Sequence, residues 1–226
     1  MKIAICLFGE LTDYKKVKEF FSSDKHEFFY FAHSYSSFTD RDFTSISIDD
    51  PYIIQDTSYF TDVGVDNIAR CPVELQAISN RPGQYTDITN SMMQANILKT
   101  KYEFENDMIF DVVVNSRFNL NRNSLRFDSV LKDDMHNYPT CIFGNYQVNY
   151  TNYRSTEFVC DFCFGSSLTM DIANNFHRYY NNGVLYKMLN SDYYDPAYKT
   201  LHYKTLFWKW INMKNITPMF IENFIK

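Results

Sequence analysis

Four polar side chains lie at the carboxyl end of the most strand-like stretch of the sequence, Met108 to Leu120. Within this run, Ile109 to Val114 is apolar except for Asp111 and rich in valine, which is typical of a strand covered on both faces of an α/β sheet. Ligands of open α/β sheets bind outside the carboxyl ends of the strands, so polar groups at this point are placed to meet a ligand. The alternative is a core strand that continues into a solvated loop. The polar residues are Asn115, Ser116, Arg117 and Asn119.

Two further candidates, Gly9 and His33, each follow an apolar run. Gly9 ends the run Lys2 to Phe8, and His33 ends the run Phe28 to Ala32. A helix that begins near Tyr14 separates the two runs, with Thr12 or Asp13 as its cap. Two strands joined by a helix predict a parallel pair with a right-handed crossover. Gly9 and His33 are therefore expected at the same edge of the sheet.

Asp161 is another candidate, because it is an acid embedded in an aromatic run, Glu157 to Gly165. A buried carboxylate needs a hydrogen-bond donor, a cation or a substrate hydroxyl. The alternative is a structural carboxylate next to Ser166 that caps a helix or pairs with an arginine.

The elements that position these residues predict an α/β fold with a mostly parallel sheet flanked by helices. We expect the central strand to lie between parallel neighbours from Ile3 to Phe8 and from Phe28 to Ala32. Helical periodicity from Ser91 to Asn106 predicts a helix that leads into the central strand, and Thr89, Asn90 and Ser91 are its candidate N-caps.

The chain of 226 residues predicts a single domain. Residues 36–82 are polar and lack a strong period, which predicts an irregular lid or insert. Residues 184–226 are expected to form a C-terminal helical extension, with an amphipathic helix from Leu201 to Met213 and an edge strand or tail from Ile216 to Phe224.

Composition excludes several classes of protein. The net charge of -5 and the absence of a basic cluster argue against nucleic acid or an anionic membrane as the main partner. Only 6 glycines are present, and neither dinucleotide-binding nor P-loop glycine motifs occur. No apolar run approaches the roughly 20 residues that span a bilayer. Five scattered cysteines and the absence of a secretory signal predict reduced thiols and a cytoplasmic location, which would be the host cytoplasm for a viral protein.

Five stretches in order resemble a loosely defined family of small glycosyltransferase-like proteins of the GT-A type, often encoded by viruses, phages and microbes. The first two are the opening strand with its Gly-polar turn, Ile3 to Leu11, and the strand end Phe29 to His33, which lacks the family's leading acid. The helix Ser91 to Glu103 matches the pattern S-x-x-x-A-x-x-L-K-x-x-Y-E. Phe110 to Leu120 resembles the family's strand with arginine, and Asp161 to Asp171 resembles its last motif in the FGSS-x-x-MD part.

The resemblance implies transfer of a sugar from a nucleotide-sugar donor to a glycan or other hydroxyl acceptor, on a Rossmann-like sheet. It implies that Gly9, His33, Arg117 and Asn119 bind the donor and that Asp161 is catalytic. Negative charge on the departing diphosphate must be met by Mn²⁺, by Mg²⁺ or by basic side chains. Asn119 stands where the family places a metal-binding acid, and an amide is a poorer ligand for a hard cation than a carboxylate.

Two classes of function remain open from the sequence. The first is an active glycosyltransferase, which Arg117, Asp161 and the FGSS segment favour. The second is a catalytically inactive relative, either a carbohydrate- or nucleotide-binding module or a virion-associated protein, which Asn119 favours. Arg117 has an alternative role of its own, a salt bridge to an acid at the sheet edge such as Asp128.

Overall fold

The protein is described from a computed structural model. The described residues are 1–9, 17, 19–34, 53–55, 82–118, 127–131, 138–148, 156–181 and 203–221, and the statements below concern these ranges. Asn119 and nearly all of the expected lid, residues 36–82, lie outside them. So does the start of the helix expected near Tyr14, although its expected apolar residues Val17, Phe20 and Phe21 are all buried.

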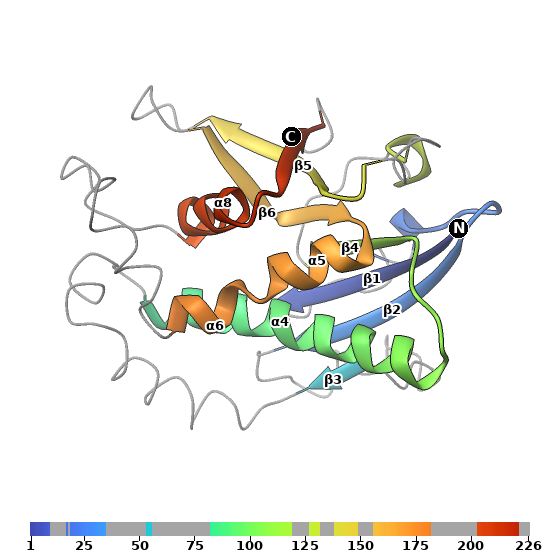
Figure 1. Cartoon of the computed structure of the whole chain (residues 1–226). Coiled ribbons are helices and arrows are strands. Elements are labelled where there is room, and N and C mark those ends of the chain that lie inside the picture. Colours follow the sequence, from blue (N-terminus) through green and yellow to red (C-terminus); the bar gives the residue numbers. More distant parts are fainter. Residues whose placement is uncertain are drawn as a thin grey trace.

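The described strands form one seven-stranded sheet of mixed direction (Figure 1). The strand order is β3-β2-β1-β4-β6-β5-β7. β6 is antiparallel to its two neighbours, β4 and β5, and the other neighbouring strands of the sheet pair in parallel. The expected α/β class with a mostly parallel sheet is confirmed. The strands are β1 (Lys2–Gly9), β2 (Glu27–Ser34), β3 (Ile53–Gln55), β4 (Val112–Arg117), β5 (Cys141–Val148), β6 (Thr156–Gly165) and β7 (Thr217–Phe220).

The neighbours of the central strand differ from the prediction on one side. β4 lies fourth of the seven strands and pairs in parallel with β1, as expected. Its other neighbour is the antiparallel β6, whereas β2 lies on the far side of β1. The crossover rule makes β1 and β2 parallel but does not say whether another strand lies between them.

The central strand also begins later than its sequence indicates. Ile109 is 77% exposed and precedes β4, while Asn115 and Ser116 are fully buried inside the strand and do not follow it. The amide of Asn115 is paired with that of Asn174, since its Nδ2 donates to Asn174 Oδ1 over 2.6 Å. A satisfied amide can occupy a core position, so the polar run did not mark the end of the strand.

The helix before the central strand begins earlier than expected. Helix α4 spans Pro82–Glu105, and proline suits its first turn because the missing N–H would have no partner there. The candidate N-caps Thr89, Asn90 and Ser91 are therefore wrong, because all three are buried within the helix. Their side chains bond to other elements or to the helix itself.

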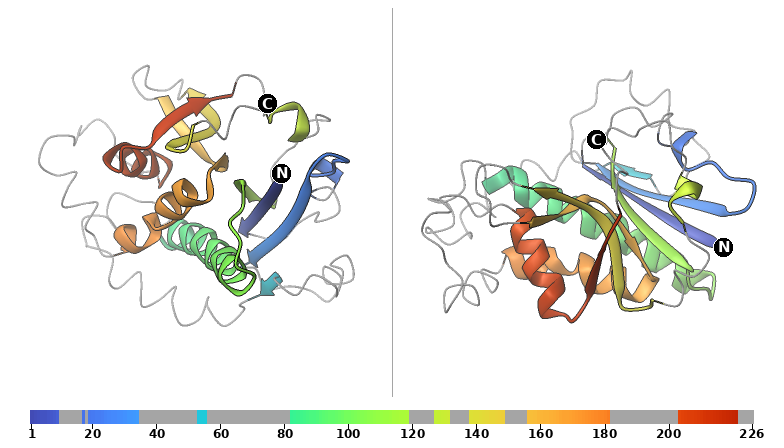
Figure 2. Two further views of the ribbon diagram at one scale, coloured as in Figure 1. Left: turned by 45° about the vertical axis from the view of Figure 1, so that its right-hand side comes forward. Right: turned by 90° about the horizontal axis from the view of Figure 1, so that it is seen from above.

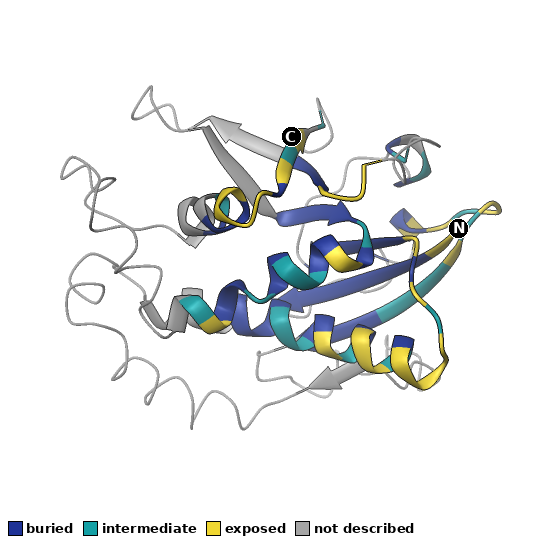
Figure 3. Ribbon diagram, in the orientation of Figure 1, coloured by how far each residue is buried: buried dark blue, intermediate teal, exposed yellow. Residues whose placement is uncertain are grey.

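Helices cover one face of the sheet with a continuous apolar core (Figures 1 and 2). This face, called here the α4 face, carries α4, α5 (Ser167–Asn174), α6 (Phe176–Asn181) and α8 (Tyr203–Met213). β1 is buried on both of its faces, whereas α4 is buried toward the sheet and exposed on its outward side (Figure 3). The opposite face has a second core that includes Val17, Phe21 and Phe127 of the short 3-10 helix η2 (Phe127–Ser129).

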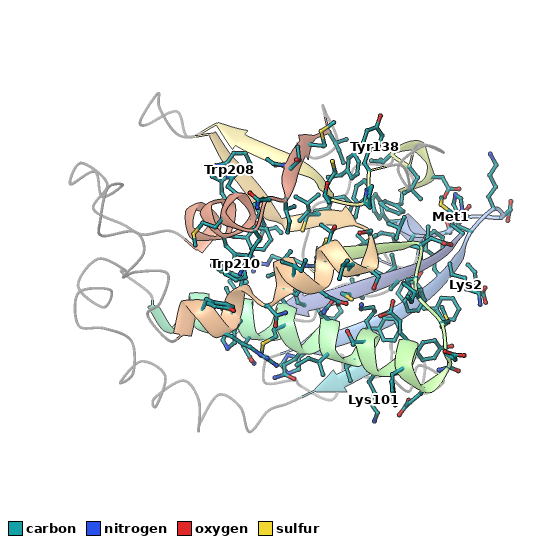
Figure 4. The ribbon with its side chains drawn as sticks, in the orientation of Figure 1. Met1, Lys2, Lys101, Tyr138, Trp208 and Trp210 are labelled. Carbon is teal, nitrogen blue, oxygen red and sulfur yellow. The ribbon has the colours of Figure 1, made fainter. Side chains whose placement is uncertain are left out.

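The C-terminal elements belong to this same fold. β7 pairs in parallel with β5, and α8 places Trp210 in the core of the α4 face (Figure 4). The indole Nε1 of Trp210 donates a hydrogen bond to the carbonyl oxygen of Ile172, over 3.1 Å. Among the described helices, none combines the length and the apolar character needed to cross a bilayer.

Candidate functional site

Four neighbouring strands place three of the predicted site residues in one lateral row. Phe8 of β1 is in register with His33 of β2 on one side and with Arg117 of β4 on the other. On the next strand, Ser116 is paired with Phe162, so Asp161 lies opposite Arg117. Strands lie about 4.8 Å apart, so the backbones of His33 and Asp161 are separated by three spacings, roughly 14 Å.

The members of this row also share a face of the sheet. Side chains alternate between faces along a strand. Phe8 itself, Phe31 two positions before His33, Val113 four positions before Arg117 and Cys163 two positions after Asp161 all belong to the core of the α4 face. The row of His33, Phe8, Arg117 and Asp161 is called here the edge row. It lies where β1, β2 and β4 reach their carboxyl ends.

Arg117 and Asp161 form an ion pair in the edge row. The guanidinium Nη1 lies 3.6 Å from the carboxylate Oδ1, and the two side chains are 20% and 11% exposed. The arginine-paired carboxylate, one of the alternatives for Asp161, is therefore the arrangement that the structure shows. The alternative partner of Arg117, Asp128, faces elsewhere, with its carboxylate 4.0 Å from the ring of His26.

Gly9 ends β1 with a backbone conformation that suits glycine. Its φ angle is 97°, in the region that L side chains rarely adopt. Its N–H donates to the hydroxyl of Ser91 on α4, over 2.9 Å. The same hydroxyl bonds to His33, so α4 ties the carboxyl ends of β1 and β2 together. The sequence pattern correctly predicted that Gly9 and His33 lie at one edge of the sheet, but it predicted Ser91 only as a candidate helix cap.

Gly9 and Arg117 flank the point where the strand order reverses. From β1 the chain proceeds through β2 to β3 on one side, and β4 then joins β1 on the other side. In open α/β sheets, ligands bind in the crevice outside the carboxyl ends of the strands at such a switch point. Gly9, His33, Arg117 and Asp161 therefore lie at one edge, as predicted. That they line a single cleft remains a prediction, as does the role of Asn119.

A buried charged network that the sequence did not reveal joins α4 to α5. Lys99 is fully buried, and its Nζ lies 2.8 Å from Glu103 Oε2, 2.7 Å from Ser167 Oγ and 2.8 Å from Asp171 Oδ1. Ser167 also donates to Glu103 Oε1 over 2.7 Å. The one signal for this network was a lysine placed on the apolar side of the predicted helix.

The turn that precedes this network is specified by its sequence. A Cβ on Gly165 would lie 2.8 Å from the carbonyl oxygen of Cys141, so the close approach of β5 and β6 requires glycine here. Ser166 then caps α5, because its hydroxyl accepts a hydrogen bond from the N–H of Thr169. The FGSS segment thus has a structural function at each of its last three positions.

Burial shifts the pKa of two side chains of the α4 face. Burial raises the pKa of the Cys6 thiol to about 12, and the nearby Lys99 opposes this shift only in part. Burial also lowers the pKa of His177 to about 4, with a smaller contribution from the charge of Arg178. The Nδ1 of His177 lies 2.9 Å from the hydroxyl of Thr89 on α4. Both groups are therefore neutral at physiological pH and act as core residues.

No protein-family model matches the sequence, and no curated protein matches it.

Proposed function

We propose that this protein is a glycosyltransferase-like protein that transfers a sugar from a nucleotide-sugar donor to a hydroxyl acceptor. The observation that carries the proposal is the placement of Gly9 and Arg117 on either side of the switch point, at the carboxyl ends of β1 and β4. A backbone without a Cβ permits a nucleotide to approach closely, and a guanidinium binds phosphate oxygens in pairs. Asp161 lies beside that guanidinium.

The fold and the resembling stretches support this proposal together. A mostly parallel sheet with one antiparallel strand is compatible with the Rossmann-like sheet of GT-A-type proteins. Two of the stretches that carry the resemblance contact each other, because Lys99 and Glu103 of the helix bond to Ser167 and Asp171 of the last stretch. These side chains act by fixing α4 and α5 against the sheet that carries the edge row.

The proposed transfer breaks the bond between the anomeric carbon and the phosphate oxygen of the donor, and forms a bond from that carbon to the acceptor oxygen. The electron pair of the broken bond leaves on the diphosphate, whose charge Arg117 stabilises. Asp161 accepts a hydrogen bond from the acceptor hydroxyl and takes its proton as the new bond forms. Because Arg117 Nη1 and Asp161 Oδ1 are 3.6 Å apart, Arg117 can contact the diphosphate while Asp161 contacts the acceptor hydroxyl in the same transfer.

The edge row does not fit a divalent cation well. It supplies one carboxylate, that of Asp161, and this group is already paired with a guanidinium. Residue 119 adds an amide where the resemblance predicts an acid. Mn²⁺ and Mg²⁺ prefer several oxygen ligands with carboxylates among them. The charge of the diphosphate is therefore assigned to Arg117.

Asn119 supports a second candidate, a catalytically inactive relative that binds a nucleotide or a carbohydrate at the same edge. Binding requires Gly9 and Arg117 but not the acid that the resemblance places at position 119. Assay of sugar release from the donor separates the two candidates, because an inactive relative binds the donor and leaves it intact.

The test is calorimetric titration with UDP, GDP and their sugar conjugates, with and without manganese. Arg117→Ala should weaken binding by about 1.5–3 kcal/mol, the range for a hydrogen bond to a charged group, which is roughly 10- to 150-fold in Kd. Lys101→Ala is the control, since Lys101 is exposed on α4 and points away from the sheet (Figure 4), and it should leave Kd unchanged. Asn119→Asp should strengthen manganese-dependent binding.

Three results would contradict the proposal. If none of the nucleotides binds the parent protein, the site has been misidentified. If Arg117→Ala and Lys101→Ala have the same affinity as the parent, the phosphate is bound elsewhere. Tight manganese-dependent binding by the parent that Asn119→Asp leaves unaltered would show that other residues hold the cation.

A further inference from the structure

The hydroxyl of Ser91 has three polar neighbours and no solvent. Ser91 Oγ lies 2.6 Å from the carbonyl oxygen of His33, 2.9 Å from the backbone nitrogen of Gly9 and 3.1 Å from Nδ1 of the His33 ring. Ser91 is fully buried, and His33 is 3% exposed. The single proton of the Ser91 hydroxyl must therefore be donated to one of these three neighbours.

The chemistry of the three neighbours decides where that proton goes. The carbonyl oxygen of His33 can only accept, and a contact of 2.6 Å between two oxygens requires a proton between them. The N–H of Gly9 can only donate, so it donates to Ser91 Oγ. The hydroxyl proton is thus committed to the carbonyl, and the oxygen has only acceptor capacity left for His33 Nδ1. That nitrogen must carry a proton.

We propose that Ser91 is a positioning residue that holds neutral His33 as the Nδ1–H tautomer, so that its Nε2 carries a lone pair. The second ring nitrogen of a histidine takes its role from the hydrogen bond that the first one makes. Any group that binds Nε2 of His33 must then be a hydrogen-bond donor or a cation. A phosphate oxygen offers neither.

This tautomer has a consequence that rests on the proposed function: Arg117 and His33 recognise different groups of the nucleotide sugar. Arg117 lies two strands from His33, a separation of roughly 10 Å between backbones, so one nucleotide sugar can contact both. Arg117 takes the diphosphate. His33 accepts a hydrogen bond from a hydroxyl of the ribose or of the sugar.

The tautomer can be read directly by NMR. Long-range proton–nitrogen correlation spectra of the ligand-free protein, labelled with ¹⁵N in its histidine rings, distinguish the Nδ1–H form, the Nε2–H form and the doubly protonated ring. The spectra are recorded at slightly alkaline pH, and His33→Gln assigns the His33 signals. The parent should show a protonated Nδ1 and an unprotonated Nε2. A proton on Nε2, or on both nitrogens, would overturn the proposal.

Substitutions at Ser91 test its role. Ser91→Ala removes the acceptor and should give His33 a measurable population of the Nε2–H form, whereas Ser91→Thr keeps the hydroxyl and should restore the parent pattern. Thr89→Ala is the matched control, because it removes a buried hydroxyl two residues away that faces His177 and should leave His33 unchanged. An unchanged His33 pattern in folded Ser91→Ala would refute the role of Ser91. If Ser91→Ala does not fold, the parent spectrum still decides the tautomer.

The spectra do not depend on the proposed function, because no nucleotide is present. If the Nδ1–H form is found but no nucleotide binds, the proposed function fails and the role of Ser91 stands. If nucleotides bind and His33 carries its proton on Nε2, the role of Ser91 fails and the proposed function stands. The contact of His33 with a ligand hydroxyl has its own test. 2′-Deoxy nucleotides and donors with deoxygenated sugars should bind more weakly to the parent than the complete ligands do. At least one of these differences in affinity should disappear in His33→Gln.

Discussion

Replacing Lys99 by methionine should destabilise the protein strongly. Lys99 is fully buried, and its ammonium group makes three hydrogen bonds of 2.7–2.8 Å to Glu103, Ser167 and Asp171. Methionine fills a similar volume, so the loss is mainly that of the charge. The carboxylate of Glu103, whose side chain is 10% exposed, would remain without its cation. Breaking a buried ion pair in this way costs about 3–5 kcal/mol.

Urea unfolding followed by circular dichroism measures this loss as a change in the unfolding midpoint at constant m value. Lys101→Met is the matched control on the same helix. Lys101 also pairs with a carboxylate four residues on, Glu105, but over 3.6 Å and with side chains 66% and 46% exposed. An exposed pair of this kind contributes about 0.3–0.5 kcal/mol. The two variants should therefore differ by several kcal/mol.

A second substitution distinguishes charge from packing. In Lys99→Met, the further change Glu103→Gln removes the unpaired charge and should restore about 1 kcal/mol or more of the stability, since residues in one network couple by about 0.5–3 kcal/mol. If Lys99→Met lies within about 0.5 kcal/mol of Lys101→Met, the burial of the ammonium group is not what stabilises the contact of α4 with α5. If Glu103→Gln adds to the loss instead, the cost comes from packing.

Two further predictions concern the same face of the sheet. Gly165→Ala should lower the free energy of unfolding by about 1–3 kcal/mol, because the new Cβ would lie 2.8 Å from the backbone oxygen of Cys141, and an unchanged urea midpoint would contradict this contact. His177 should make stability depend on pH, because burial lowers its pKa from 6.5 to about 4. Between these values the unfolded chain binds the proton and the folded chain does not, so stability falls as the pH falls from 6.5 to 4, by about 3 kcal/mol in total. His177→Asn should remove this part of the slope, and equal slopes in parent and variant would refute the assignment.

Local patterns in the sequence were sufficient for the class of fold and for the edge of the sheet where the candidates lie. The apolar runs that end at Gly9 and His33 are strands, and the crossover rule placed both residues at one edge correctly. The pattern of Leu201 to Met213 predicted α8 to within two residues. These predictions depend on periodicity and on short-range connections, which the sequence contains directly.

Contacts between distant residues decided the remainder. The partner of Arg117 is Asp161 and not Asp128, because the antiparallel pairing of β4 with β6 sets that register. The sequence pattern does not determine which strand lies on the free side of β4. Registers of this kind arise when faces far apart in the chain are buried together, and a one-residue shift would move every side chain to the other face.

The same reason explains the residues whose roles were missed. When only the neighbouring residues in the sequence are considered, Ser91 is interpreted as a helix cap and Lys99 as a surface residue. Ser91 instead joins the ends of β1 and β2, and Lys99 joins α4 to α5. A polar side chain can be buried only where its partners meet it. The partners of Ser91 lie 58 to 82 positions away, and the partners of Lys99 on α5 lie 68 to 72 positions away. The sequence therefore determined which residues are polar, and the tertiary structure decided which of them are buried and what each one binds.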